Sequence, residues 1–231
     1  MTKPRKSIFY QFWNRGIVKV KISWILITAS VNSRLRRVID RLNRQANRER
    51  RGEVKLAPDQ EMLAITADTA IFFSILIKAI KAKRILEVGT SSGFSTLWFA
   101  DAMATNCEGR VITIEMNPLK VARAWKNFKE AGVGNMIEIK RGIALDVLHK
   151  LKGKFDFVFL DADKDNIIRY FDLVLPMVRI GGIIAADNML YPEHFRPAMR
   201  KYARHVHGKP NIQSITVPIG MGEEVTIKLH H

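Results

Sequence analysis

The feature that most constrains the fold is a regular alternation of short apolar runs with helical stretches from Lys83 onward. Such alternation predicts parallel strands joined by right-handed crossovers. Continuously apolar runs such as Phe157–Leu160 favour a sheet that is covered on both faces. The predicted strands are Arg84–Val88, Arg110–Glu115, Met136–Lys140, Phe155–Asp161 and Gly182–Asp187, and the predicted helices are Ser95–Met103, Pro118–Ala131, Ala144–Leu151, Asn166–Val178 and Glu193–His205.

Two further strands, Ile212–Val217 and Val225–Leu229, close the chain without a helix between them, which predicts an antiparallel hairpin at the sheet edge. The expected fold class is therefore α/β, with a doubly wound, mostly parallel, seven-stranded sheet. In such sheets ligands bind outside the carboxyl ends of the strands. The residues that follow Val88, Ile114, Leu160 and Ala186 are accordingly the first candidates for a site.

Charge divides the chain into two regions. The 231 residues carry a formal net charge of +16, and residues 1–55 alone hold 15 Lys or Arg against 3 acidic residues. We therefore predict a basic helical N-terminal extension over residues 1–55 and a catalytic domain over residues 56–231. The single cysteine, Cys107, excludes an intramolecular disulfide and favours a cytoplasmic location. The apolar run Ile22–Val31 is too short to span a bilayer.

The loop after the first strand, Gly89 to Gly93, opens a helix and could accept a ligand at the helix N-terminus. Because position 91 is serine, the loop lacks the dinucleotide pattern and favours a ligand without phosphates over a pyrophosphate. A plain strand–helix turn is the alternative. Glu115, at the end of the second strand, could accept ribose hydroxyls or could be an exposed carboxylate. Glu87, in a buried strand, needs a partner.

A second group of polar residues follows the fourth and fifth strands. Asp161, Asp187 and Asn188 offer hard oxygen ligands of the kind that Mg²⁺, Ca²⁺ or Mn²⁺ prefer. The sequence contains no cluster of His and Cys residues of the kind that would favour zinc. Near a cation the ammonium form of Lys164 is disfavoured, so Lys164 is a candidate general base.

Three segments together carry a family resemblance. The runs Ile85–Ala100, Val158–Lys164 and Gly181–Asn188 resemble the cation-dependent O-methyltransferases of the caffeoyl-CoA and catechol type, and the likeness extends from Met62 to Leu229. The resemblance implies a Rossmann-like, S-adenosylmethionine-dependent methyltransferase that acts as a homodimer on a small-molecule hydroxyl.

The resemblance also implies roles for individual residues. Glu87 and the backbone near Ile65 would hold the methionine ammonium, and Gly89, Thr90 and Ser95 would line its carboxylate. Glu115 would bind the ribose, and Ala144 would lie by the adenine. Asp161, Asp187 and Asn188 would bind the cation, with Mg²⁺ expected first, and Asp161 would also border the cofactor. Lys164 and Asp161 would form the catalytic pair.

The chain departs from the family at several positions. The family's Pro, Gly and Gln are replaced by Asp68, Ala70 and Ile71, and Ile143 stands where an acid often lies beside the adenine. Near the end, a Gly-Asp-Gly-Leu type of loop is present as Gly220-Met221-Gly222-Glu223. The cation ligands and the lysine are retained.

The basic extension has three interpretations. Two apolar helical faces, one formed by Ile8, Phe9, Phe12 and Trp13 and the other by Leu35, Val38, Ile39 and Leu42, could pack on the domain or on a second subunit. The arginines could instead contact RNA, which would make the enzyme a tRNA hydroxyl methyltransferase. Docking on an anionic membrane surface is the third interpretation. A noncatalytic adaptor is a further alternative.

Overall fold

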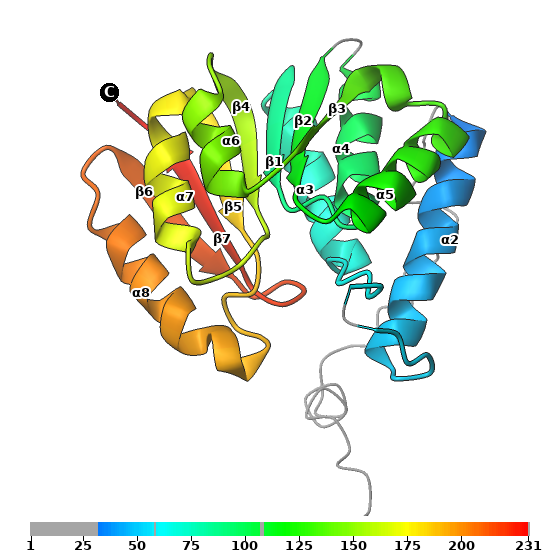
Figure 1. The fold of residues 1–231 in the computed structure, drawn as a ribbon. Coiled ribbons are helices and arrows are strands. Elements are labelled where there is room, and N and C mark those ends of the chain that lie inside the picture. Colours follow the sequence, from blue (N-terminus) through cyan, green and yellow to red (C-terminus); the bar gives the residue numbers. More distant parts are fainter. Residues whose placement is uncertain (1–31, 58, 107–108, 231) are drawn as a thin grey trace, which may run out of the picture.

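The structure is a computed structural model that describes residues 32–57, 59–106 and 109–230. Its centre is a seven-stranded sheet with strand order β3-β2-β1-β4-β5-β7-β6 (Figure 1). Strands β1 to β5 are parallel, and β7 pairs antiparallel with both β5 and β6. The predicted doubly wound sheet is confirmed. The strands are β1 Arg84–Val88, β2 Arg110–Glu115, β3 Ile137–Arg141, β4 Phe155–Leu160, β5 Val178–Ala186, β6 Ile212–Val217 and β7 Glu223–Lys228.

Helices cover both faces of the sheet, and alternate strand residues serve the two layers. Phe157 and Phe159 of β4 belong to one apolar core with α2 to α5, whereas Val158 and Leu160 belong to a second core with α6 to α8. The helices are α2 Ser33–Arg50, α3 Ala67–Ala79, α4 Phe94–Thr105, α5 Pro118–Ala131, α6 Ala144–Lys150, α7 Ile167–Val174 and α8 Arg196–His207. Short 3₁₀ turns occupy Gly134–Met136, Leu175–Met177 and Glu193–Phe195.

Two strands begin at least two residues earlier than the sequence predicts, whereas the other strand ends agree within one residue. Strand β5 begins at Val178 rather than Gly182, because Pro176 ends the preceding helical stretch in a 3₁₀ turn. The pairing register of β4 and β5 shifts between Phe155 and Phe157, which accommodates the early start. Strand β7 begins at Glu223 rather than Val225, so two acidic residues enter the sheet next to the carboxyl end of β5.

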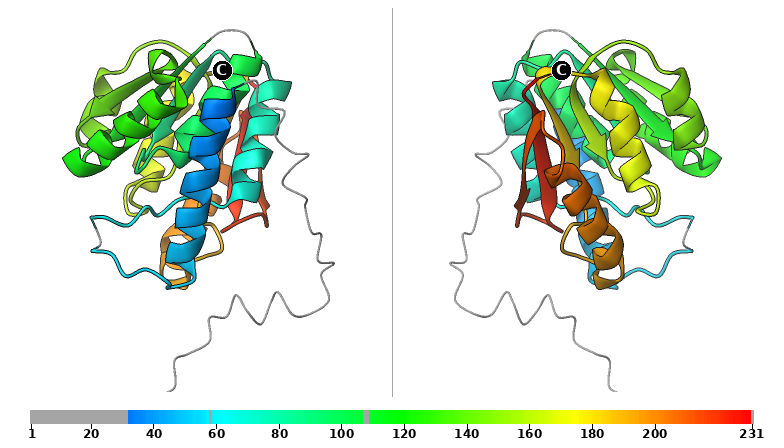
Figure 2. Two further views of the ribbon diagram at one scale, coloured as in Figure 1. Left: turned by 90° about the vertical axis from the view of Figure 1, so that its right-hand side faces the viewer. Right: turned by 90° about the vertical axis from the view of Figure 1, so that its left-hand side faces the viewer.

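Helix α2, from the predicted extension, packs against α4 and α5 (Figure 2). Its residues Leu35, Val38, Ile39 and Leu42 are at most 5% exposed and join the core that contains α3 to α5. This apolar face therefore packs on the domain, as the first interpretation of the extension expects. The other apolar face, Ile8 to Trp13, lies outside the described residues. In the described parts of the chain, no helix is both long and apolar enough to cross a membrane.

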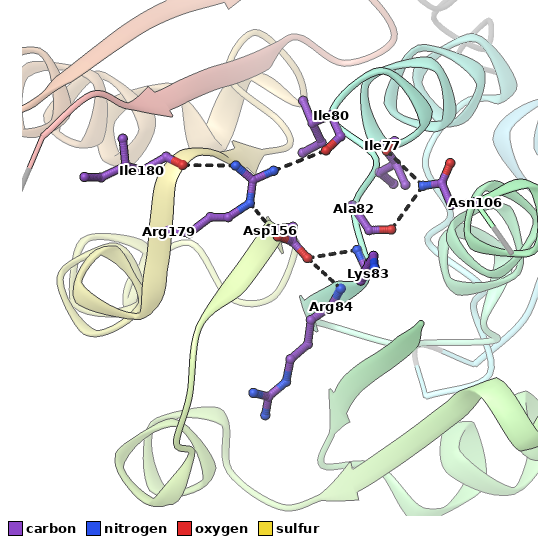
Figure 3. A network of polar contacts seen from close by, with 9 residues as sticks. All are labelled: Ile77, Ile80, Ala82, Lys83, Arg84, Asn106, Asp156, Arg179 and Ile180. Carbon is purple, nitrogen blue, oxygen red and sulfur yellow. Dashed lines mark hydrogen bonds and ion pairs between the residues drawn. The ribbon is translucent and has the colours of Figure 1, made fainter. Parts of the chain in front are cut away.

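A polar network fastens the amino ends of the central strands (Figure 3). Oδ2 of Asp156 in β4 accepts hydrogen bonds of 2.8 Å from the backbone amides of Lys83 and Arg84. Its Oδ1 accepts from Nε of Arg179 in β5 at 2.5 Å. Arg179 also donates to the carbonyl of Ile80 at 3.2 Å. The network holds β1, β4 and β5 in register at the edge opposite the carboxyl ends.

Candidate active site

The carboxyl ends of β1, β2, β4 and β5 border one cavity of about 810 Å³. That volume lies within the range of ~300–1,000 Å³ that is usual for small-molecule sites. At one end the cavity is lined by the β1–α4 loop and Glu115, and at the other by acidic residues and aromatic rings. The predicted site residues on its wall are Ile65, Gly89, Thr90, Ser95, Glu115, Ala144, Asp161, Lys164, Asp187 and Asn188.

Glu87 is the one predicted site residue that does not line the cavity. It is fully buried in β1, and its carboxylate accepts hydrogen bonds from the hydroxyls of Ser95 at 2.5 Å, Thr96 at 2.5 Å and Thr113 at 2.6 Å. Burial raises the pKa of Glu87 to about 7, although the three hydroxyls act in the opposite direction. The partner that the sequence required is thus supplied from within the chain, and contact with a ligand ammonium stays a prediction.

The two glycines of the β1–α4 loop have structural reasons of their own. Gly89 has φ +109°, and a Cβ there would lie 2.0 Å from the carbonyl oxygen of Asp161. Gly93 has φ +82°, and a Cβ there would lie 2.3 Å from the ring of Phe128. A side chain at either position would combine left-handed backbone strain with overlap. The glycines let the loop pack tightly against its neighbours, and Thr90 and Ser91 between them line the cavity.

Glu115, the last residue of β2, is held against the β1–α4 loop. Its Oε2 accepts a hydrogen bond of 2.9 Å from the amide of Ser91, and its Oε1 accepts one of 2.9 Å from the amide of Asn117. Each carboxylate oxygen can accept more than one donor. The carboxylate is therefore fixed in orientation and partly accessible, which is what the recognition of neighbouring ribose hydroxyls requires.

The acidic end of the cavity joins the predicted catalytic residues. Nζ of Lys164 lies 2.9 Å from Oδ1 of Asp161, and the lysine is only 5% exposed. The ring of Phe195 lies 6.0 Å from the same ammonium group. Burial, followed by repulsion from Asp161, raises the pKa of Asp187 to about 7. A lysine and two carboxylates therefore share one part of the cavity, in which Lys164 and Asp187 are buried and Asp161 is partly exposed.

The predicted cation ligands meet in the cavity but do not form a complete cluster of charged ligands. Oδ1 of Asp187 accepts from the amide of Asn188 at 2.7 Å, and the side-chain amide of Asn188 donates to the carbonyl of Tyr191 at 3.1 Å. Asn188 has φ +72°. Across the described ranges, no group of three or more His, Cys, Asp or Glu side chains is placed to hold a metal ion.

Sequence reasoning did not identify three polar contributors to the site. Ser91 donates from its hydroxyl to the carbonyl of Met62 at 2.5 Å, and Arg50 at the end of α2 donates to the carbonyl of Ile65 at 2.9 Å. Glu223 is fully buried next to Asp187. Ser91 lies in the loop already singled out, but Arg50 and Glu223 come from distant segments that only the tertiary fold brings to the site.

Comparison with known proteins identifies the family. The O-methyltransferase family matches residues 43–222. A catechol O-methyltransferase of Mycobacterium tuberculosis is 39% identical over 135 residues, which cover 58% of this chain and 60% of that enzyme. A caffeoyl-CoA O-methyltransferase of Petroselinum crispum is 34% identical over 191 residues, which cover 74% of this chain and 78% of that enzyme.

A solved structure agrees with this match. The O-methyltransferase from Streptomyces achromogenes that is involved in tomaymycin synthesis, in complex with S-adenosylmethionine, superposes with a TM-score of 0.70 at 28% identity. The match covers 84% of this chain and 90% of that one. The sheet order, the cavity and these relatives lead to one conclusion: the chain belongs to the O-methyltransferase family that includes the catechol and caffeoyl-CoA enzymes, and it is an S-adenosylmethionine-dependent O-methyltransferase.

Proposed function

We propose that the chain transfers a methyl group from S-adenosylmethionine to a hydroxyl of a catechol-like or phenolic small molecule, with a divalent cation bound at Asp161, Asp187 and Asn188. The observation that carries the proposal is the buried Lys164–Asp161 pair at 2.9 Å in the same cavity as the cofactor loop. The named activities of the M. tuberculosis and P. crispum relatives support the choice of acceptor.

The donor set fits a cation of the Mg²⁺ type. Two carboxylates and one amide supply oxygen ligands, and the set contains no thiolate or imidazole of the kind that would favour zinc. When bound at Asp161, Asp187 and Asn188, a divalent cation would favour ionisation of the acceptor hydroxyl that is to be methylated. Mg²⁺ is the expected ion, with Ca²⁺ or Mn²⁺ as the alternatives.

The residues of the chain would accept the proton, position the lysine and bind the cofactor. Lys164 would accept the proton of the acceptor hydroxyl, and Asp161 would hold the lysine in place through the 2.9 Å contact. The cofactor would lie along Ser91, Ser95 and Glu115, with its methyl group pointing toward the acidic end. Much of the rate gain would come from holding donor and acceptor in line, away from water.

The acceptor end of the cavity favours an aromatic substrate. Tyr170, Tyr191, Phe195 and Met221 line it, and they supply apolar and ring surfaces next to the polar catalytic group. Flat aromatic acceptors gain from such surfaces through ring stacking and contact with polarisable sulfur. A vicinal diol on the ring would place one oxygen near Lys164.

The decisive experiment combines binding with turnover. S-adenosylmethionine would be titrated by isothermal calorimetry, and methyl transfer to catechol would then be measured in the same sample with Mg²⁺ and with EDTA. We expect saturable binding and turnover that EDTA abolishes. Lys164→Ala should lower kcat by about 100- to 10,000-fold while cofactor affinity stays within twofold.

Each alternative result has a distinct meaning. Turnover that EDTA does not affect would refute the cation dependence. Binding without any turnover of catechol would refute the proposed acceptor class. A failure to bind the cofactor would support the adaptor alternative. Lys201→Ala is the matched control, because it removes an exposed lysine of α8 that does not line the cavity, and it should leave kcat unchanged.

The wider predictions are tested separately. The comparisons give no support to the RNA-methyltransferase alternative, and a flat dependence of tRNA binding on salt would argue against an RNA arm. We also propose a homodimer, which light scattering would test, and a cytoplasmic location, which fractionation would test. Binding of residues 1–55 to anionic membranes would be measured with phosphatidylserine vesicles.

A further inference from the structure

The pairing of β5 with β7 brings a buried glutamate to the proposed cation site. Ala186, the last residue of β5, pairs with Glu224, so Glu223 follows in register beside Asp187. Glu223 is fully buried and Asp187 is 4% exposed. Residues that face each other across an antiparallel ladder have neighbouring side chains, so the carboxyl groups of Glu223 and Asp187 lie side by side. The antiparallel strand therefore supplies an acidic side chain to an edge otherwise built from parallel strands.

Glu223 is anchored from the side of helix α3. Its Oε1 accepts a hydrogen bond of 3.0 Å from the hydroxyl of Thr69. That hydroxyl in turn accepts one of 3.0 Å from the hydroxyl of Thr66, which is the N-cap of α3. A Cβ at Gly220 would lie 2.0 Å from the Thr69 hydroxyl, so the loop before β7 rests directly on this pair. The Glu223 carboxyl group is thus held rigidly.

The other oxygen of Glu223 accepts no hydrogen bond from the part of the chain that the structure describes. Among the buried side-chain atoms of the residues that the structure describes, Oε2 of Glu223 is one of four without a hydrogen-bond partner. Leaving a buried polar atom without a partner is unfavourable, because the atom has lost its contact with water. Asp187 is the neighbour within reach, and an ionised carboxylate only accepts. Contact between the two side chains is favourable when a single proton lies between them.

The backbone around Asp187 is held by the same loop. The amide of Met189 donates to the carbonyl of Gly222 at 2.9 Å, and the amide of Leu190 donates to the carbonyl of Met221 at 3.0 Å. The loop before Glu223 is therefore hydrogen-bonded to the residues after Asp187, while Glu223 lies beside the side chain of Asp187. One structural unit orients both the backbone and the carboxylate of the proposed ligand.

We propose that Glu223 is a positioning residue for the cation ligand Asp187. Through its carboxyl group, anchored by Thr69, it holds the Asp187 carboxylate in the orientation that binds a divalent cation. This inference rests on the proposed function, because it assumes that Asp187 binds a cation. Partners that orient a ligating carboxylate commonly change cation affinity by about 10- to 100-fold.

The test measures cation binding without turnover. Mn²⁺ would be titrated into the full chain and the free ion measured by electron paramagnetic resonance, for wild type, Glu223→Gln and Glu223→Leu. Glutamine keeps the shape of the side chain, can accept from Thr69 and can donate to Asp187. We expect Glu223→Gln to bind Mn²⁺ within about threefold of wild type and Glu223→Leu to bind it about 10- to 100-fold more weakly.

Two further measurements separate positioning from a loss of folding. The affinity for S-adenosylmethionine should be unchanged in every variant. Thr69→Val removes only the hydroxyl that anchors Glu223 and serves if Glu223→Leu does not fold; it should weaken Mn²⁺ binding by about three- to tenfold. Glu224→Gln is the matched control, since Glu224 is equally buried in β7 but accepts from Ser214 and Thr216, and it should bind Mn²⁺ like wild type.

The outcomes discriminate between the two proposals. Wild-type affinity in both Glu223→Leu and Thr69→Val would overturn the positioning role and leave the cation site intact. Equal weakening in Glu223→Gln and Glu223→Leu would show that the charge of Glu223 is used, which would also overturn it. A wild-type chain that binds no Mn²⁺ would refute the cation site and this role together.

Discussion

The buried carboxyl group of Glu87 makes a prediction about stability that can be worked out in sign and size. Burial raises its pKa from the ordinary 4.5 to about 7 in the folded chain. Between these two pH values the folded chain holds a proton that the unfolded chain has lost. The free energy of unfolding that Glu87 contributes is therefore full below pH 4.5 and is lost as pH rises to about 7.

The size of the effect follows from the same interval. One bound proton changes the free energy of unfolding by ~1.4 kcal/mol for each pH unit. The interval from 4.5 to about 7 is then worth up to ~3 kcal/mol. Because the side chain is fully buried, solvent screening does not reduce this figure. Glutamine at position 87 does not titrate and should lack the contribution.

Urea unfolding of wild type and Glu87→Gln at pH 5 and pH 8 would measure the effect. The other titrating groups, including Asp187, contribute equally to the free energy of unfolding of both proteins. Their contribution therefore cancels when the two proteins are compared. We expect wild type to lose ~2–3 kcal/mol more than the variant between these pH values. Glu138→Gln is the control, because the hydrogen bond from Lys140 is the main cause that lowers the pKa of Glu138. Equal losses in wild type and Glu87→Gln would refute the reasoning and show that the three hydroxyls outweigh burial.

Two other substitutions test the packing of the site and of the extension. Gly89→Ala should destabilise the chain by ~2–4 kcal/mol in thermal and urea unfolding, because its Cβ would lie 2.0 Å from the backbone of Asp161, whereas Gly52→Ala, with no atom within 4 Å, should cost only ~1 kcal/mol. Leu42→Ala in α2 should cost ~2–4 kcal/mol in urea unfolding, against less than ~0.5 kcal/mol for the exposed Arg44→Ala. Similar values for the two members of either pair would contradict the corresponding packing.

The local pattern of the sequence was sufficient for most of the fold. Strands β1, β2 and β6 and helix α5 begin and end where their apolar patterns and turn residues predicted. The prediction was less accurate near Val178, because a proline turn and a register shift interrupt the regular pattern. Helix α3, ahead of the first strand, was not predicted.

The candidate site was predictable where motifs border strand ends. Ten of its residues lie on one cavity, because the carboxyl ends of parallel strands meet at one edge. Glu87 was placed on the same motif, yet it lies behind the hydroxyls of Ser95 and Thr96. A sequence pattern shows that a buried carboxylate needs a partner, but it does not show whether the chain or a ligand supplies one.

The sequence by itself determined the strand–helix alternation, the acidic residues that end β4 and β5 and the lysine that follows Asp161, since each depends on neighbours in the chain. Only the tertiary structure decided which distant side chains meet these residues. It brought Arg50 from α2 to the cavity and Glu223 from β7 to Asp187, and it joined the apolar face of α2 to the core. Such contacts depend on how strands pair and helices pack across the whole chain, and no local pattern encodes them.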